Sequence, residues 1–187
     1  MRIISGQFKG KKIFDPKNNK TRPLRDLVKE SIFNILKHSN KFNINIEHSV
    51  ILDLFSGVGS FGLEAISRGS LKVFFVENFP ESLKILKRNI NNLNVNNNTV
   101  IIEKNIYSSL NFGSLNTLFD LIFLDPPFKD QNINYLIEKI YDAKILKKNG
   151  IIILHRSSKS NDLIGKKFNI FEEKKYGLSK IIFGSFC

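Results

Sequence analysis

Apolar and polar positions along the chain predict strands that alternate with helices. Short apolar runs of the kind that form buried strands lie at 50–54, 72–76, 100–103, 119–124 and 150–154. Between them, apolar residues recur at helical spacing at 61–68, 80–93 and 134–146. Because parallel strands are joined by crossover helices, this alternation predicts an α/β fold with a mostly parallel sheet and helices on both faces.

The two ends of the chain depart from this alternation. Segments 168–175 and 178–186 flank Tyr176-Gly177 and predict an antiparallel hairpin that closes the sheet. Residues 1–20 predict a short basic hairpin or arm, and Thr21-Arg22-Pro23 opens an amphipathic helix. The predicted apolar face of that helix consists of Leu24, Leu27, Val28, Ser31, Ile32, Ile35 and Leu36. We therefore divide the chain into an N-terminal extension, residues 1–40, and an α/β domain with a seven-stranded sheet, residues 41–187.

The composition is that of one soluble domain with its own core. The chain has 187 residues, of which 42% are hydrophobic. No apolar stretch approaches the roughly 20 residues of a membrane span, and the first residues show no secretory signal. The one cysteine, Cys187, has no partner for an internal disulfide. We expect a cytoplasmic protein that functions as a monomer.

A formal net charge of +12 favours a polyanionic partner. In the predicted arm a single acid, Asp15, stands against Arg2, Lys9, Lys11, Lys12, Lys17 and Lys20. Arg22, Arg25 and Lys29 of the following helix are candidates for contacts with backbone phosphates. A solvated helix face would have the same composition, so both interpretations stay open.

A glycine-rich segment between the first strand and the next helix points to a nucleotide-containing ligand. Residues 57–62 read Gly-Val-Gly-Ser-Phe-Gly, and Glu77 follows Gly57 by 20 residues at the end of the second strand. Glycines allow close approach of the backbone, and a carboxylate at that strand end accepts hydrogen bonds from ribose hydroxyls. Taken alone, this pattern is typical of a dinucleotide site, or of a tight turn with no ligand.

Other positions favour S-adenosylmethionine over a nicotinamide dinucleotide. Asp53 lies inside the first strand, four residues before Gly57. A carboxylate there would repel a pyrophosphate, but it suits a cationic amino-acid tail and a sulfonium. Phe55-Ser56 occupies the place where a dinucleotide fold usually begins its glycines.

The fourth strand ends in Asp125-Pro126-Pro127-Phe128, over the same edge of the sheet. The prolines stiffen the turn, because neither can extend a ladder of hydrogen bonds. The acid and a prolyl carbonyl can accept N–H bonds from a flat, amine-bearing ring while the aromatic side chain stacks on it. The alternative is a stiff turn with a packed Phe.

Together, residues 50–65, Glu77 and residues 125–128 resemble class I methyltransferases. More narrowly, they resemble exocyclic-amine N-methyltransferases with an (Asp/Asn)-Pro-Pro-(Tyr/Phe) motif. Residues 2–13 and 21–36, with Tyr176-Gly177, narrow this to the RsmD-like family of bacterial 16S rRNA guanine-N2 methyltransferases. The resemblance covers nearly the whole chain and implies a Rossmann-like fold, with an RNA-binding extension at 1–40 and a catalytic domain at 41–187.

The resemblance implies roles for individual residues. Asp125, Pro126 and Phe128 are the expected catalytic residues, with Asp125 and the Pro126 carbonyl accepting both N–H bonds of the amine. Phe128 would form one wall of the base site. The expected S-adenosyl-L-methionine site consists of Asp53, Phe55, Gly57, Gly59, Glu77, Asn105 and Ile106. The expected contacts with substrate are Arg22, Arg25, Pro127 and Phe128. The implied partner is 16S rRNA or an assembly intermediate of the small ribosomal subunit, and no metal is implied.

The chain departs from the family after the fifth strand, where His155-Arg156 replaces a usual Glu. We expect His38, His48 and His155 to be surface or core histidines without catalytic roles. Three other functions stay open at this point. The same fold could methylate DNA adenine or a protein glutamine, the chain could bind RNA without catalysis, or it could be a nicotinamide oxidoreductase.

Overall fold

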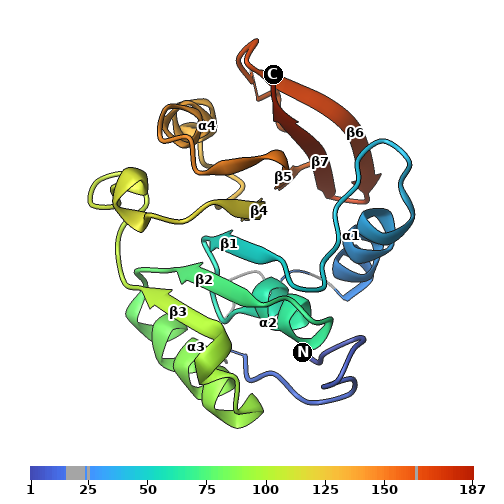
Figure 1. Cartoon of the computed structure of the whole chain (residues 1–187), viewed down its shortest axis with the longest axis vertical. Coiled ribbons are helices and arrows are strands. Elements are labelled where there is room, and N and C mark those ends of the chain that lie inside the picture. Colours follow the sequence, from blue (N-terminus) through green and yellow to red (C-terminus); the bar gives the residue numbers. More distant parts are fainter. Residues whose placement is uncertain (16–23, 25, 163) are drawn as a thin grey trace.

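A seven-stranded sheet forms the centre of the computed structural model, which describes residues 1–15, 24, 26–162 and 164–187 (Figure 1). The strand order is β3-β2-β1-β4-β5-β7-β6, and only the pairs that involve β7 are antiparallel. The predicted parallel sheet with an antiparallel C-terminal hairpin is therefore confirmed. The strands are β1 (Val50–Leu54), β2 (Lys72–Val76), β3 (Thr99–Ile102), β4 (Phe119–Leu124), β5 (Leu146–Ser157), β6 (Phe168–Tyr176) and β7 (Ser179–Phe186).

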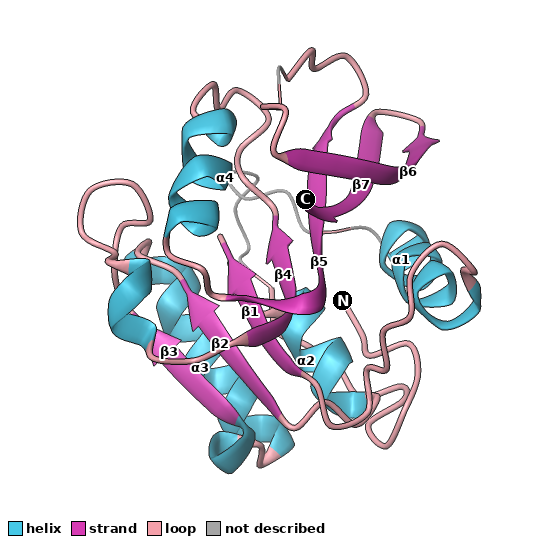
Figure 2. Cartoon of the chain, turned by 45° about the horizontal axis from the view of Figure 1, so that its top comes forward, coloured by secondary structure: helices cyan, strands magenta, loops and turns pink. Residues whose placement is uncertain are grey.

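Helices cover both faces of the sheet because side chains alternate along each central strand (Figure 2). Ile51 and Leu121 pack on the face that carries α1, α2 and α3, whereas Leu52 and Ile122 pack toward α4. The described helices are α1 (Asp26–His38), α2 (Ser60–Ser67), α3 (Pro80–Leu93), α4 (Ile133–Asp142) and the 3-10 turns η1 (Asn96–Asn98) and η2 (Phe112–Leu115).

The strand order reverses between β1 and β4, which pair in parallel. From β1 the chain proceeds outward to β2 and β3, whereas from β4 it proceeds to β5 on the other side. The loops after β1 and β4 therefore diverge and leave a crevice at the carboxyl ends of the strands, where open α/β sheets bind ligands. This is the edge at which the glycine loop and residues 125–128 were expected to meet.

Two local expectations were wrong. The helix expected at 134–146 ends at Asp142, because Lys144 adopts a φ of 50° and Leu146 already pairs with Phe119 in the sheet. β5 thus begins earlier than expected and carries an irregularity opposite Phe119 and Leu121. In α1, Leu27 was expected on the apolar face but is 68% exposed.

The N-terminal arm is anchored on Glu64, a buried residue of α2. The Glu64 carboxylate accepts the backbone N–H groups of Ile4 and Ser5 at 2.8 and 3.0 Å. The Lys29 ammonium of α1 lies 3.6 Å from the same carboxylate, and both side chains are fully buried. The expectation that Lys29 contacts backbone phosphates was therefore wrong. Arg68 donates to the Glu64 carboxylate from Nε at 2.8 Å. Glu64 therefore ties the arm, α1 and α2 together.

The arm also shares the hydrophobic core of the sheet. Ile3 and Ile13 are each 1% exposed and belong to the same cluster as the α2 and α3 side chains. A bridge between Arg2 and Lys12 closes the arm as the expected short hairpin. The division at residue 40 stays a prediction, and the packing shows that the arm, α1 and the sheet have one continuous core.

Replacing Glu64 with Ala should lower the free energy of unfolding by about 3–5 kcal/mol, because the buried Lys29 ammonium loses its main counter-charge. Burial lowers the pKa of Lys29, and the Glu64 and Asp26 carboxylates oppose that shift. Urea denaturation monitored by circular dichroism measures the loss.

The matched control is Glu103→Ala, which breaks an ion pair with Lys87 in which both side chains are about half exposed. That change should cost at most about 1 kcal/mol. Equal losses for the two variants would contradict a structural role for the buried network.

Candidate functional site

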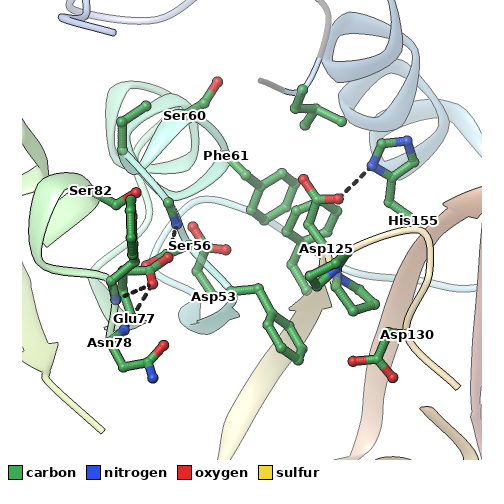
Figure 3. Close-up of a pocket in the computed structure, with 18 of the residues that line it drawn as sticks. Asp53, Ser56, Ser60, Phe61, Glu77, Asn78, Ser82, Asp125, Asp130 and His155 are labelled. Carbon is green, nitrogen blue, oxygen red and sulfur yellow. Dashed lines mark hydrogen bonds and ion pairs between the residues drawn. The ribbon is translucent and has the colours of Figure 1, made fainter. Parts of the chain in front are cut away.

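A cavity of about 700 Å³ lies over the carboxyl ends of β1, β2 and β4. Figure 3 shows its polar residues, with Glu77 and Asp125 on opposite sides of Asp53. Residues from six parts of the chain line it, including the N-terminal segment. Eight of the expected site residues are among them: Asp53, Phe55, Gly57, Glu77, Asp125, Pro126, Pro127 and Phe128.

The glycine loop reaches the cavity because its backbone adopts left-handed conformations. Gly57 has a φ of 55° and lines the cavity, where a bound ligand can approach its backbone. Gly62 meets a different requirement, because a Cβ atom there would lie 2.3 Å from the Phe75 ring. The first glycine therefore serves the site and the last allows α2 to pack closely on β2.

Glu77 holds the loop that follows β1 against the loop that follows β2. Its Oε2 accepts the N–H of Gly57 at 2.7 Å, and its Oε1 accepts those of Asn78 and Phe79, each at 2.8 Å. A carboxylate has about four acceptor positions, so it can still accept bonds from ligand hydroxyls. The Glu77 side chain is thus held in one orientation and can still accept a hydrogen bond from a ligand in the cavity.

Asp53 places a second carboxylate at the floor of the cavity. It is 1% exposed, and its Oδ2 accepts the N–H of Gly62 at 3.1 Å. Burial raises the pKa of Asp53 well above its usual value; the Gly62 bond opposes this rise, and the charges of Asp125 and Glu77 add to it. Three acidic groups converge on one cavity, which is an environment that favours a cation.

Asp125 is held from both its backbone and its side chain. Its N–H donates to the carbonyl of Leu54 at 3.3 Å, which links the ends of β1 and β4. Its Oδ1 lies 2.7 Å from Nδ1 of His155 on β5. The Phe128 ring meets the His155 ring edge to face, with centroids 5.3 Å apart. The four-residue motif is therefore braced by the neighbouring strand.

Arg156 holds the rest of the turn that follows β4. The side chain is buried and donates from Nη1 to the Pro127 carbonyl at 3.2 Å and from Nη2 to the Asp130 carbonyl at 2.6 Å. Asp162 fixes the guanidinium in turn through Nε and Nη2. Burial by itself raises the pKa of Asp162, but the bonds from Arg156 and Ser160 and the nearby Lys180 lower it overall.

Three expected site residues that the structure describes, Gly59, Asn105 and Ile106, are not among those that line the cavity. Asn105 uses its amide oxygen to accept the N–H groups of Tyr107 and Ser108 within its own turn. Ile106 is buried in the core on the α4 face. Gly59 packs against the side chain of Leu86. Arg22 and Arg25 lie outside the described residues. Their expected roles stay predictions.

Sequence reasoning missed several polar groups of the cavity, among them His155 and Tyr107. His155 was expected to be an ordinary histidine, but it lines the cavity and contacts Asp125. Tyr107 lies beside Phe55, and its hydroxyl donates to Asp130 at 2.8 Å. Burial, and then the bond to Asp130, raise the pKa of Tyr107. The position of His155 on the strand beside β4 was the signal that could have identified it.

Within residues 1–15, 24, 26–162 and 164–187, no group of three or more His, Cys, Asp or Glu side chains has an arrangement that could hold a metal ion. The described helices are all too short or too polar to cross a bilayer.

Comparison with known proteins found a matching family model and curated relatives. The model described as Conserved hypothetical protein 95 matches residues 1–185. The chain is 32% identical to the ribosomal RNA small subunit methyltransferase D of Buchnera aphidicola subsp. Acyrthosiphon pisum over 172 residues, which cover 92% of this chain and 86% of the relative.

Solved structures have the same fold. A proposed methylase from Haemophilus influenzae is 28% identical and has a TM-score of 0.74, with coverage of 98% of this chain and 96% of its own. A proposed methyltransferase complexed with SAH is 16% identical and has a TM-score of 0.67, with coverage of 83% of this chain and 48% of its own. At that identity the second likeness shows the fold alone.

Replacing Asp53 with Asn should stabilise the folded protein at neutral pH. Because the folded-state pKa of Asp53 is raised above its unfolded value of about 3.9, the folded protein binds more protons, and stability falls as pH rises between the two values. Asn can still accept the Gly62 bond without carrying a charge.

Thermal melts of the wild type and Asp53→Asn between about pH 3.5 and 8 test this, with the gain growing as pH rises. Asp142→Asn, at the exposed end of α4, removes the same charge without relieving burial. A lower melting temperature for Asp53→Asn at pH 7 would argue against a strained buried carboxylate.

Proposed function

The chain belongs to the family that the model Conserved hypothetical protein 95 describes, and from this we propose that it methylates the exocyclic N2 amine of a guanine in small-subunit rRNA, with S-adenosyl-L-methionine as the cofactor. The observation that carries the proposal is the convergence of Asp53, Glu77 and Asp125 on one cavity at the switch point of the sheet. Relatives named ribosomal RNA small subunit methyltransferase D support the substrate class.

The cofactor side of the cavity lies between β1 and β2. Glu77 accepts the ribose hydroxyls, and the Gly57 backbone allows the methionine end to approach closely. The Asp53 carboxylate below offsets the positive charge of the ligand. SAH, which occupies a solved neighbour of this fold, is the product that S-adenosylmethionine leaves after methyl transfer. When bound, the cofactor supplies an electrophilic methyl carbon on a sulfonium.

The substrate side lies at the end of β4. The guanine amine is a weak nucleophile because its lone pair is delocalised into the ring. Asp125 and the Pro126 carbonyl accept its two N–H bonds and so direct the lone pair at the methyl carbon. Asp125 would stabilise the positive charge that develops on the nitrogen as it gains the methyl group, and the proton that the nitrogen then loses would pass to the Asp125 carboxylate or to solvent. Phe128 packs against the base.

The substrate amine must be unpaired to enter such a cavity, so the base is flipped out or lies in a loop. The arm that contributes Met1 and Asp15 to the cavity wall also exposes Lys9, Lys11 and Lys12. These lysines bind RNA phosphates near the entering base. The natural substrate is 16S rRNA, free or in an assembly intermediate of the small subunit.

Asp125→Ala should lower kcat for methyl transfer at least about 100-fold, because the amine loses its charged acceptor. Cofactor affinity, measured by calorimetry, should change by no more than about threefold, since Asp125 acts on the substrate. Asp120→Ala is the control. It removes a carboxylate from the same strand, but Asp120 lies near the opposite end of β4 and pairs with Lys147.

The assay supplies labelled methyl donor with small-subunit rRNA, assembled subunits, DNA or protein, and then maps the methylated guanines. Transfer to DNA or protein in place of rRNA would redirect the proposal to another substrate. Comparable turnover by Asp125→Ala and the wild type would overturn the assigned chemistry.

Glu77→Gln should weaken cofactor binding about 10- to 100-fold, because the ribose loses its bond to a charged acceptor. Isothermal titration with S-adenosylmethionine measures the dissociation constant. Glu138→Gln, on the exposed side of α4, provides a charge-matched control. Equal affinities of the wild type and Glu77→Gln would remove Glu77 from the cofactor site.

A further inference from the structure

His155 is the one histidine that lines the cavity among the described residues, and both of its ring nitrogens are bonded. Nδ1 lies 2.7 Å from Asp125 Oδ1, and Nε2 lies 2.9 Å from the Ser179 hydroxyl of β7. The residue is 6% exposed. The imidazole therefore has a fixed position between the end of β4 and the C-terminal hairpin.

The chemistry of the partners determines which nitrogen carries the proton. An ionised carboxylate can only accept, so Nδ1 of His155 must donate to Asp125. In a neutral ring Nε2 is then an acceptor, and the Ser179 hydroxyl donates to it. Ser179 thus satisfies Nε2 in the tautomer that the Asp125 carboxylate requires.

The arrangement resembles a hydrolase triad only in its residue types. Ser179 is 4% exposed and does not line the cavity, so its hydroxyl cannot reach a substrate there. Asp125, in contrast, opens onto the cavity, with 22% of its side chain exposed. Of the three hydrogen-bonded residues Ser179, His155 and Asp125, it is therefore the Asp125 carboxylate that can contact a substrate.

We propose that His155 is a positioning residue that holds Oδ1 of Asp125 so that Oδ2 faces the substrate amine. The inference deepens the proposed function and rests on it. Within the described part of the chain, no residue donates a hydrogen bond to Oδ2. The edge of Phe128 against the His155 ring limits rotation of the imidazole. Ser179 and His155 together hold the carboxylate in one orientation before a substrate binds.

Three variants of His155 separate this role from ordinary packing. His155→Ala removes both bonds and should lower kcat about 10- to 100-fold. His155→Asn places an amide N–H near the position of Nδ1, so it should stay within about threefold of the wild type. His155→Gln reaches instead toward Ser179 and should resemble Ala.

The measurements are kcat and KM for methyl transfer to small-subunit rRNA, with melting temperatures as a check on folding. The KM for S-adenosylmethionine should stay within about twofold in all three variants, because His155 acts on the substrate side. Nitrogen-15 spectra of the wild type should show His155 protonated at Nδ1.

Each outcome decides between the two proposals. If the wild type is active and His155→Ala has the same kcat, the positioning role alone is overturned. Equal losses of kcat in His155→Asn and His155→Gln would also overturn it. A ring protonated only at Nε2 would also overturn it. A wild type that transfers no methyl group to any RNA would overturn the proposed function and this inference with it.

Discussion

The parallel pairing of β1 with β4 is the constraint on which the candidate site depends. Leu54 lies opposite Leu124, so the two strands end at the same level and their next residues enter one crevice. Asp53 lies opposite Phe123 and faces α2. A shift of one residue would turn Asp53 to the other face of the sheet. The register therefore decides whether the acidic groups meet at all.

The site contains a buried carboxylate that destabilises the folded protein, whereas buried charges elsewhere in the described structure have partners. Asp53 is buried among like charges, which raises its pKa and destabilises the folded state at neutral pH. Glu64, Lys29 and Arg156, which are also buried, are instead matched with partners. The buried carboxylate of Asp53 lies at the cavity, where a cationic ligand can compensate its charge, as expected for a site that trades stability for function.

The sequence predicted most of the fold because its signals are local. Apolar runs marked the central strands, and the glycines and Glu77 identified the ligand edge. The end of α4 was missed because β5 already pairs with β4 at Leu146, a contact that no local pattern encodes. His155 was missed for the same reason, since its role follows from neighbours on β4 and β7. Asn105 and Ile106 were carried over from the family, and in this chain they face their own turn and the core.

The bond between His155 and Ser179 has a consequence for how the protein matures on the ribosome. Ser179 lies on β7, 24 residues beyond His155. Because chains emerge from the N-terminal end, the strands that carry Asp53 and Glu77 are synthesised well before β7. A nascent chain can therefore form its cofactor wall while Asp125 is still loosely oriented. Full orientation of Asp125 waits for the last strand.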